Sequence, residues 1–586
     1  MDHRFNGKLS GWLLPVDQSR FHIPFLLSLC LLIFFPFLGA RDFWGLENHY
    51  AEITRVMLVE GNVAIPKLNE TAWFENPPFF FWLALLFSWL AAQVSEWSMR
   101  LVPALSATAL VLAFYLFSKK RFGSRIAFLS AVVMATSLLT IHVERHMLLN
   151  MIFFLFVTLS MFLLMEVLVF DSSRWSHVYG SWLFMGLVCL TKGPFSLFFP
   201  ATAVCFYCSL SGRWRKVLAL RPLSGAALFL AITAPWFAFV IWKTSGAWAD
   251  VFLTSSNIWR YKSDLAGNLH LLFYSVVHFP LYFIPWIFLF LPAMITFWPE
   301  RAKIWDGAIQ FLFLWFSAIL LFSQFYGGEH SYYLFLALPP AALAVGVYLD
   351  RLITSPPTGT ARLWTRRFIL PCCFLLSLAG VAAPVAAAFG WPDLAWPMAI
   401  FGVALVGGAL GLLYAMRNQN YRAVVCGLAL LMVGINLLAQ KLILPSANRL
   451  QGRPFAGEIG AIIKPDSRVG IHKTGSSRPL YNFNYYSRIR RFEILRGPKD
   501  MMEFLSGPGP RFIVTTRRAA SRIKKFWQGD LNLVAEQPAG GPKRWFPLEE
   551  RWLLLYSCNG GCEPAPSSAK SQNLPSGPLR ASYLSN

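Results

Sequence analysis

The stretch RDFWGLENHYAEITRVMLVEGNVAIPKLNETAWFENPPFFFWLALL, residues 41–86, follows the first apolar segment and decides how the rest of the chain is interpreted. It combines many aromatic rings with five glutamates, Glu47, Glu52, Glu60, Glu70 and Glu75. A solvated linker is the simplest interpretation, but the aromatic residues and the Pro77-Pro78 break favour a folded segment. We therefore expect an ordered polar loop outside a membrane span.

The composition places the chain among polytopic membrane proteins. Of its 586 residues, 56% are hydrophobic and only 14% are charged, which is too apolar for a soluble domain. The net charge of +23 could suggest nucleic acid. However, most basic residues cluster in short segments between apolar spans, so the excess mainly reflects membrane topology. A basic surface would also attract anionic lipid headgroups.

Apolar stretches long enough to cross a bilayer, about 20 residues each, divide most of the chain. They lie near 22–40, 101–118, 125–143, 151–170, 222–242, 271–298, 308–325, 333–350, 368–389, 396–415 and 423–441. The stretch 179–210 is broken by Thr191-Lys192-Gly193-Pro194 and predicts a tight pair of spans. The sequence thus predicts about 13 transmembrane helices.

The basic residues predict the orientation. With this count the amino-terminal segment lies on the same side of the membrane as the basic clusters at 119–125, 213–216, 301–303, 362–367 and 417–422. The positive-inside rule makes that side cytoplasmic. Residues 79–92 are apolar but short, and counting them as a span would invert every later loop. We expect them to form a helix in the outer interface, entered through Pro77-Pro78. The loops 41–100, 144–150, 191–194, 243–270, 326–332 and 390–395 then face outside.

The last part of the chain changes character. Residues 467–473 and 511–516 have the pattern of strands, with a helical stretch around 499–505 between them. We expect a multi-span domain at 1–440, an extracytoplasmic α/β domain at 441–557 and a disordered tail at 558–586. The first span has no convincing small-residue cleavage site, so it is expected to remain as an anchor.

The cysteines point to no metal centre. Seven of the nine lie in apolar spans, where thiols act as small hydrophobes. Cys205 and Cys208 have a zinc-like spacing, but they lie in an apolar stretch without a second pair. Cys558 and Cys562 could form a disulfide if their end of the chain is extracytoplasmic.

Five strings, taken in order, resemble GT-C glycosyltransferases, specifically the lipid A aminoarabinose transferases and the related protein mannosyltransferases. They are ENHYAEITRVMLVEGNVAIPKL (47–68), FENPPFFFWL (74–83), RLVPALSATALVLAFYLFSKKRFGS (100–124), LTKGPFSLFFP (190–200) and HSYYLFLALPPAALAVG (330–346). The resemblance implies a polyprenyl-phosphate sugar donor and transfer at the outer membrane face. Such chemistry needs a cation or metal for the leaving phosphate and a carboxylate or an oriented attack for the acceptor.

The chain departs from the family at its acids. The family's Asp-Glu pair is Leu46-Glu47 here, and its second aspartate is Asn150. His49 replaces the family's arginine, and Asn76 replaces the lysine of the Glu-Lys-Pro-Pro motif. An asparagine can form hydrogen bonds but cannot hold charge or act as a base. Either a glutamate has taken over the carboxylate role, or the acceptor needs no strong base, or catalysis has been lost.

The resemblance carries over a set of candidate site residues. The catalytic candidates are Glu47 and Glu52. The candidates for binding substrate or lipid phosphate are Arg55, Glu75, Lys192, Arg260, His330, Asn150 and Tyr332. Simpler roles are also open, such as helix capping for Glu47 and Glu75, and snorkelling for Lys192. No cluster demands a metal, and a divalent cation is left open as a cofactor.

These observations favour a membrane glycosyltransferase of the bacterial inner membrane, with a cytoplasmic N-terminus and a periplasmic C-terminal domain. It would move a sugar from a polyprenyl-phosphate donor to a lipid or cell-envelope acceptor on the outer face. The alternative is a catalytically degenerate relative that binds polyprenyl-phosphate lipids or supports a partner. A transporter ranks third, because no inverted repeat is visible and the polar residues crowd one face.

Overall fold

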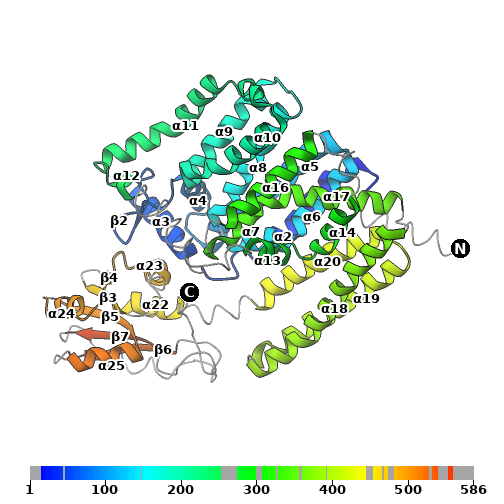
Figure 1. Ribbon diagram of the computed structural model, residues 1–586. Helices are drawn as coiled ribbons and strands as arrows, with labels where there is room; N and C mark the ends of the chain where they lie inside the picture. Colours follow the sequence, from blue (N-terminus) through cyan, green and yellow to red (C-terminus); the bar gives the residue numbers. More distant parts are fainter. Residues whose placement is uncertain are drawn as a thin grey trace.

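The computed structural model describes residues 15–43, 46–146, 148–251, 274–297, 307–324, 328–355, 359–390, 392–443, 453–464, 467–472, 481–495, 497–507, 509–526, 531–538 and 552–558. Within these ranges a large helical body precedes a smaller unit built around a sheet (Figure 1).

The helical body is a succession of mostly apolar helices. They are η1 (Ser19–Phe21), α2 (His22–Phe34), α3 (Leu46–Glu60), α4 (Phe79–Leu90), α5 (Glu96–Phe122), α6 (Ser124–Thr136), α7 (Leu138–His146), α8 (Leu148–Leu168), α9 (Trp175–Lys192), η2 (Pro194–Leu197), α10 (Phe198–Ser211), η3 (Trp214–Leu220), α11 (Pro222–Lys243), α12 (Ala247–Val251), α13 (Tyr274–Tyr282), α14 (Ile287–Phe297), α16 (Gly307–Gln324), η7 (Gly328–Ala337), α17 (Leu338–Thr354), α18 (Gly359–Gly390), α19 (Pro392–Arg417), α20 (Tyr421–Leu438) and the π-helical turn η8 (Ala439–Ile443). In the described part of the chain, eight helices are long and apolar enough to cross a membrane, or up to ten if each bent pair counts as one span. The chain is a polytopic α-helical membrane protein.

Each stretch predicted as a span overlaps one of these helices or a bent pair, but the count of 13 is not reached: in the described residues the helices at 22–40 and 308–325 are, like α4, shorter than those that could cross a membrane. The predicted pair in 179–210 is present as α9 and α10, which are separated at Gly193, whose φ of +91° suits glycine. Two stretches expected to be single straight spans are bent. The helices α6 and α7 meet at 52°, and α13 and α14 meet at 117°. Pro280 and Pro285 lie at the second bend and lack the backbone N–H that a continuous helix needs.

Ion pairs show which helix ends lie on the same side. Arg125 at the start of α6 contacts Asp350 near the end of α17 at 2.6 Å, and Arg422 at the start of α20 contacts Asp17 ahead of α2 at 2.6 Å. Arg125 also lies 3.8 Å from Asp17, so these four residues form one group. All four fall on the side that the charge pattern predicts to be cytoplasmic.

The helix α4 is too short to be a span. Its 12 residues extend about 18 Å, against about 30 Å of hydrocarbon. It packs against α3 and the start of α5, and its exposed residues include Trp89 and Leu90. This geometry agrees with the interface helix predicted for residues 79–92.

The small unit contains a five-stranded mixed sheet. Its strands are β3 (Arg468–His472), β4 (Glu493–Ile494), β5 (Arg511–Thr516), β6 (Leu531–Pro538) and β7 (Trp552–Cys558), in the order β4-β3-β5-β7-β6. The helices are α22 (Arg453–Ile462), α23 (Tyr481–Ser487), α24 (Pro498–Ser506) and α25 (Arg517–Phe526). The inner strand β5 is buried at every residue, and β3 at every residue after Arg468, as expected for a sheet with helices on both faces.

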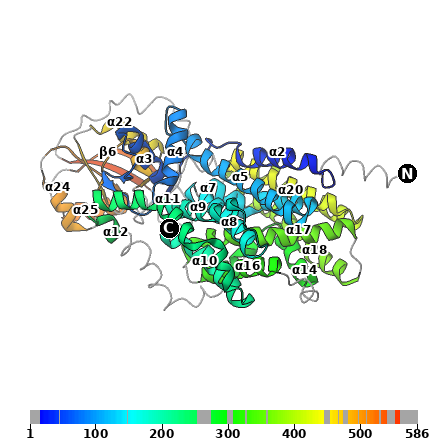
Figure 2. The same ribbon diagram turned by 90° about the horizontal axis from the view of Figure 1, so that it is seen from above.

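The sheet unit docks at one end of the helical body, beside α3 (Figures 1 and 2). A short hairpin of β1 (Lys67–Leu68) and β2 (Thr71–Ala72) follows α3. The side-chain amide of Asn69 at its tip exchanges two hydrogen bonds, of 2.9 and 2.6 Å, with the backbone of Phe492. The helix α3, the hairpin and the sheet unit therefore lie together at this end of the molecule.

Candidate functional site

The helix α3 carries three of the predicted site residues. Glu47 lies in its first turn, where a carboxylate is favoured by the helix dipole. Glu52 and Arg55 follow one and two turns later. The residues Glu47 and Glu52 are almost fully buried, whereas Leu46, at the position of the family's aspartate, is 49% exposed.

Glu47 is the centre of a buried charge cluster. Its two oxygens accept hydrogen bonds from Arg41 Nη2 at 2.9 and 2.8 Å, and from Arg100 Nε and Nη2 at 3.3 and 3.0 Å. Arg100 also donates to the carbonyl oxygens of Leu38, Arg41 and Asp42. Both carboxylate oxygens are therefore already engaged by arginines. A catalytic role for Glu47 requires one of them to move.

A second carboxylate lies close to this cluster. Glu144 on α7 is fully buried and pairs with the neighbouring Arg145 at 2.9 Å. Arg145 donates to the carbonyl of Ile33, and its own carbonyl accepts from Arg41 Nη2 at 3.2 Å. The end of α2, the start of α3, α5 and α7 are thus joined by buried charges.

Glu52 and Arg55 form a separate pair on α3. The guanidinium of Arg55 binds both oxygens of Glu52, at 2.7 and 2.6 Å. Burial raises the pKa of the Glu52 carboxyl, and the hydrogen bonds from Arg55 and the nearby charge of Arg490 partly offset this effect. Arg55 remains 20% exposed, so one face of this bidentate cation stays open to an oxyanion.

Lys192 ends α9 inside a cage of aromatic rings. Its Nζ donates to Tyr333 Oη at 3.0 Å and lies 4.4 Å from the centre of that ring. The ring centres of Phe153 and Tyr332 are 4.7 and 5.1 Å away. Such ring faces attract a cation without neutralising its charge. Since no carboxylate among the described residues pairs with Lys192, its charge is available to an anion.

Asn150 lies on α8, one helical turn before Phe153 of this cage. Its side chain is only 9% exposed, and its Oδ1 has no hydrogen-bond partner among the described residues. A buried polar atom without a partner is costly. Asn150 can therefore accept a hydrogen bond from a bound molecule, although it cannot act as a base.

The remaining predicted residues are more scattered. Glu75 is exposed in the turn that precedes α4. Arg260 and the side chain of His330 lie outside the described residues. Over the described ranges, no group of three or more His, Cys, Asp or Glu side chains could hold a metal ion. Cys205 and Cys208 are free thiols on α10, and Cys562 lies outside the described residues.

The fold is similar to those of two solved transferases. The chain matches ArnT from Cupriavidus metallidurans bound to undecaprenyl phosphate with a TM-score of 0.75, over 93% of this chain and 99% of that one, at 19% identity. The chain has the GT-C fold of that transferase. The apo oligosaccharyltransferase of Archaeoglobus fulgidus is a more distant match, with a TM-score of 0.52 at 10% identity, over 86% of this chain and 70% of that one.

Sequence comparison leads to the same group. The family model of dolichyl-phosphate-mannose-protein mannosyltransferase matches residues 75–242 of this chain. An undecaprenyl phosphate-α-4-amino-4-deoxy-L-arabinose arabinosyl transferase of Enterobacter is 27% identical over 370 residues, which are 62% of this chain and 65% of the relative. Its counterpart from Edwardsiella ictaluri is 26% identical over 72% of this chain and 76% of the relative. An uncharacterised Aquifex aeolicus protein is 28% identical over 56% and 73%. For the Enterobacter relative the matched length is just under two thirds. The resemblance predicted from the five strings is confirmed.

Within this GT-C fold, two groups of predicted residues come together. Lys192 and Tyr332 share the aromatic cage, and Glu52 pairs with Arg55. Sequence reasoning missed Arg41 and Arg100, the partners of Glu47. A signal was present for Arg100, because an arginine at the start of a predicted span needs a partner. It also missed Tyr333 and Phe153, whose aromatic character does not stand out in so apolar a chain.

Proposed function

We propose that this chain is an integral membrane glycosyltransferase that moves a sugar from a polyprenyl-phosphate donor to a lipid or cell-envelope acceptor. The observation that best supports this proposal is the similarity of the fold to a transferase solved with undecaprenyl phosphate, over nearly the whole of both chains. The reaction takes place on the outer face of the bacterial inner membrane. The N-terminus is cytoplasmic and the C-terminal unit periplasmic.

In the transfer, the bond between the sugar's anomeric carbon and the donor phosphate oxygen breaks, and a bond from that carbon to the acceptor oxygen forms. The electron pair of the broken bond stays with the polyprenyl phosphate, which needs a cation to stabilise it. Lys192 supplies this charge, because its aromatic cage fixes the ammonium group and leaves it without an anionic partner among the described residues. Asn150 orients the sugar or acceptor through its open amide oxygen.

Loss of the family's aspartates is compatible with an acceptor that is already anionic. A phosphate acceptor is deprotonated at neutral pH and needs orientation more than a base. Arg55 and the basic residues near it provide that orientation, and Glu52 holds Arg55 in place. Glu47 either acts directly or fixes the loop through Arg41 and Arg100.

The alternative function is that of a non-catalytic binder of polyprenyl-phosphate lipids. It is favoured by one observation, namely that both oxygens of Glu47, the carboxylate left from the family's Asp-Glu pair, are held by arginines. This function would retain the Lys192 cage and need no acid or base.

The test is a comparison of envelope lipids and glycans by mass spectrometry in strains with and without the gene. Loss of one sugar substituent on deletion, restored by the wild-type chain, is the expected result. If the substituent is unchanged while the purified protein still binds undecaprenyl phosphate, the binder function holds instead.

A further inference from the structure

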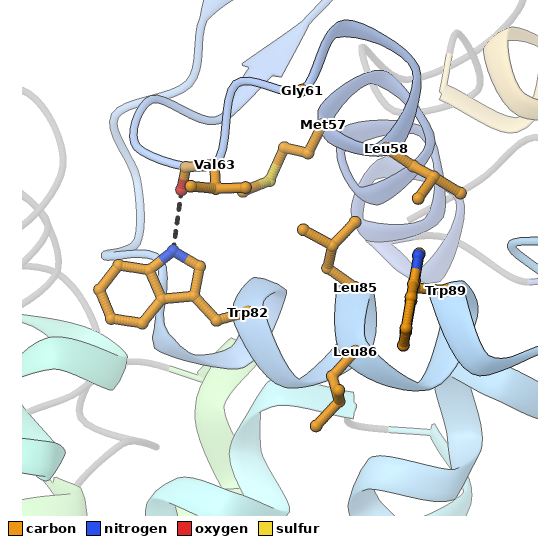
Figure 3. A pocket seen from close by; sticks show the side chains of 8 residues that line it. All are labelled: Met57, Leu58, Gly61, Val63, Trp82, Leu85, Leu86 and Trp89. Atoms are coloured by element: carbon orange, nitrogen blue, oxygen red, sulfur yellow. Dashed lines mark hydrogen bonds between the residues drawn. The ribbon is translucent and has the colours of Figure 1, made fainter.

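An open apolar groove lies between α3 and α4, on the same end of the molecule as the candidate site (Figure 3). It has a volume of about 540 Å³. Met57, Leu58 and Val63 form its α3 side, and Trp82, Leu85 and Trp89 form its α4 side. Figure 3 shows the two tryptophans at opposite ends, with Leu85 pointing into the space between them. The indole of Trp82 is fixed by a hydrogen bond of 2.8 Å to the carbonyl of Val63.

The groove opens where a lipid chain can reach it. Trp89, Leu86 and Leu90 on α4 are 66%, 47% and 65% exposed. A helix with such a surface lies in the membrane interface, where tryptophan rings sit at the level of the headgroups. An apolar groove in that position excludes water only when an acyl or prenyl chain fills it.

One wall of the groove continues into a basic surface. Leu58 lies one helical turn after Arg55, so the two side chains are neighbours on α3. The loop after α23 carries Arg488, Arg490 and Arg491, which are exposed and form no ion pair with the described residues. The Asn69–Phe492 hydrogen bonds hold this loop against the hairpin that follows α3.

The aromatic cage is not part of the groove. Trp82 packs in an apolar cluster with Leu190 and Trp236, and Leu190 lies two residues before Lys192. None of the cage residues is among those that line the groove, so we assign the groove to a molecule other than the donor.

We propose that the groove and the adjoining arginine loop bind one lipid together, an acyl chain in the groove and a phosphate-bearing headgroup at Arg490. The combination of an apolar slot, the partly exposed Arg55 one helical turn from Leu58, and the exposed arginines of the adjoining loop fits an anionic phospholipid-like acceptor. This inference rests on the proposed function only in naming the lipid as acceptor, since the binding itself requires no transfer.

The experiment is photo-crosslinking of the full-length purified protein with diazirine-tagged phosphatidic acid. Labelling of the peptides that carry α3 and α4 is the expected result. Leu58→Trp fills the groove and should lower this labelling about tenfold. Val59→Trp, on the neighbouring residue that is 60% exposed and does not line the groove, should leave it unchanged. Trp89→Ala removes an exposed wall and gives a second variant if Leu58→Trp folds poorly.

The headgroup is tested by reversing a charge. Arg490→Glu should lower labelling about tenfold, because hydrogen bonds to charged groups are among the strongest individual contacts. Arg522→Glu, the same change on the exposed side of α25, should have no effect.

Two probes decide between the possible occupants. Stronger groove labelling by diazirine-tagged undecaprenyl phosphate than by phosphatidic acid would assign the groove to the donor tail and overturn the proposal. Equal labelling by diazirine-tagged diacylglycerol, unaffected by Arg490→Glu, would show ordinary contact with bulk lipid and also overturn it. Labelling as expected in a protein that transfers no sugar would retain the lipid site while rejecting the proposed function.

Discussion

At the scale of single residues, the candidate site contains two charges with opposite surroundings. Glu47 is enclosed by the guanidinium groups of Arg41 and Arg100, so its charge is compensated. Lys192 is enclosed by ring faces and one phenol oxygen, so its charge is not. A compensated buried charge supports structure, whereas an uncompensated one is suited to a ligand.

A double-mutant cycle can distinguish a structural role of Glu47 from a catalytic one. Glu47→Gln leaves two buried arginines without their counter-ion and should lower stability by about 3–5 kcal/mol. If Glu47 is structural, adding Arg41→Gln should recover part of this stability and part of the transfer activity. If Glu47 is catalytic, stability recovers in the double variant, but the transfer rate stays at least about a hundredfold below that of the wild type, as loss of a general acid–base group predicts. Thermal unfolding and transfer rates of all four proteins provide the measurement.

The charge of Lys192 should control binding of the donor lipid. Lys192→Gln is expected to weaken undecaprenyl-phosphate binding by about 1.5–3 kcal/mol, the value of a charge-assisted contact. Lys216→Gln is the matched control, because Lys216 is already paired with Asp171 at 2.5 Å. Equal affinity of the Lys192 variant and wild type, in a folded protein, would remove Lys192 from the site.

Glu52 should give the stability a specific pH dependence. Burial raises the pKa of its carboxyl above the ordinary value of 4.5, so the folded protein binds this proton more tightly than the unfolded chain. Its contribution to stability is complete below pH 4.5 and is lost as the pH rises through the folded-state pKa. Glu52→Gln should therefore gain stability relative to wild type as the pH rises from about 4 to 7.

The measurement for Glu52 is chemical unfolding in detergent across that pH range. Glu60→Gln serves as control, because Glu60 is a surface residue of the same helix, paired with Lys67. A difference between Glu52→Gln and wild type that does not change with pH would contradict the raised pKa.

Residue-level chemistry was only partly predictable from the sequence. Lys192 and Tyr332 stand in strings that resemble a family, so their importance could be inferred before their contact was known. The pairing of Glu47 with Arg41 and Arg100 could not be inferred, because these two arginines are separated by 59 residues and meet only when the loop folds back. Long-range pairing of this kind leaves no periodic signal in one sequence.

At the scale of elements, hydropathy and charge located the helices well, because a bilayer imposes one length and one polarity on every span. The bend of 117° between α13 and α14 was missed. Average hydropathy over 271–298 is high whether the backbone is straight or bent. Pro280 and Pro285 can interrupt a helix, but the direction of the second helix is set by packing against neighbours.

Cysteine labelling tests the topology of these elements. Introduced cysteines at Ser124 and Arg366 should be protected from impermeant reagents in intact cells, and those at Asn69 and Ser476 should react. The expectation follows from the group formed by Arg125, Asp350 and Asp17 on one side and from the shortness of α4. Reaction of the Ser124 position from outside would mean that α4 crosses the membrane.

At the scale of the whole molecule, the sheet unit is attached to the loop that carries the candidate carboxylates. Tyr486 Oη accepts a hydrogen bond from the backbone N–H of Phe43 at 2.7 Å and donates to Glu96 at 2.7 Å. Arg453 pairs with Asp42 at 2.7 Å. The unit thus holds residues 42–43, next to Arg41. An α/β fold here could be expected from strand patterns, but its docking surface depends on scattered polar residues that no local pattern identifies.

This attachment predicts that the sheet unit positions the site from a distance. Tyr486→Phe keeps the ring and removes one oxygen, so the N–H of Phe43 loses its partner at a cost of about 1–3 kcal/mol. If residues 41–43 shift as a result, Arg41 no longer holds Glu47, and transfer should fall by about tenfold or more while binding of undecaprenyl phosphate at Lys192 stays the same. Tyr179→Phe is the control. Tyr179 lies near the start of α9, at the end opposite Lys192, and its hydroxyl bonds to Ser224 on α11. Equal loss of lipid binding and transfer in Tyr486→Phe would indicate general unfolding, and unchanged transfer would show that the sheet unit is attached to the loop without controlling it.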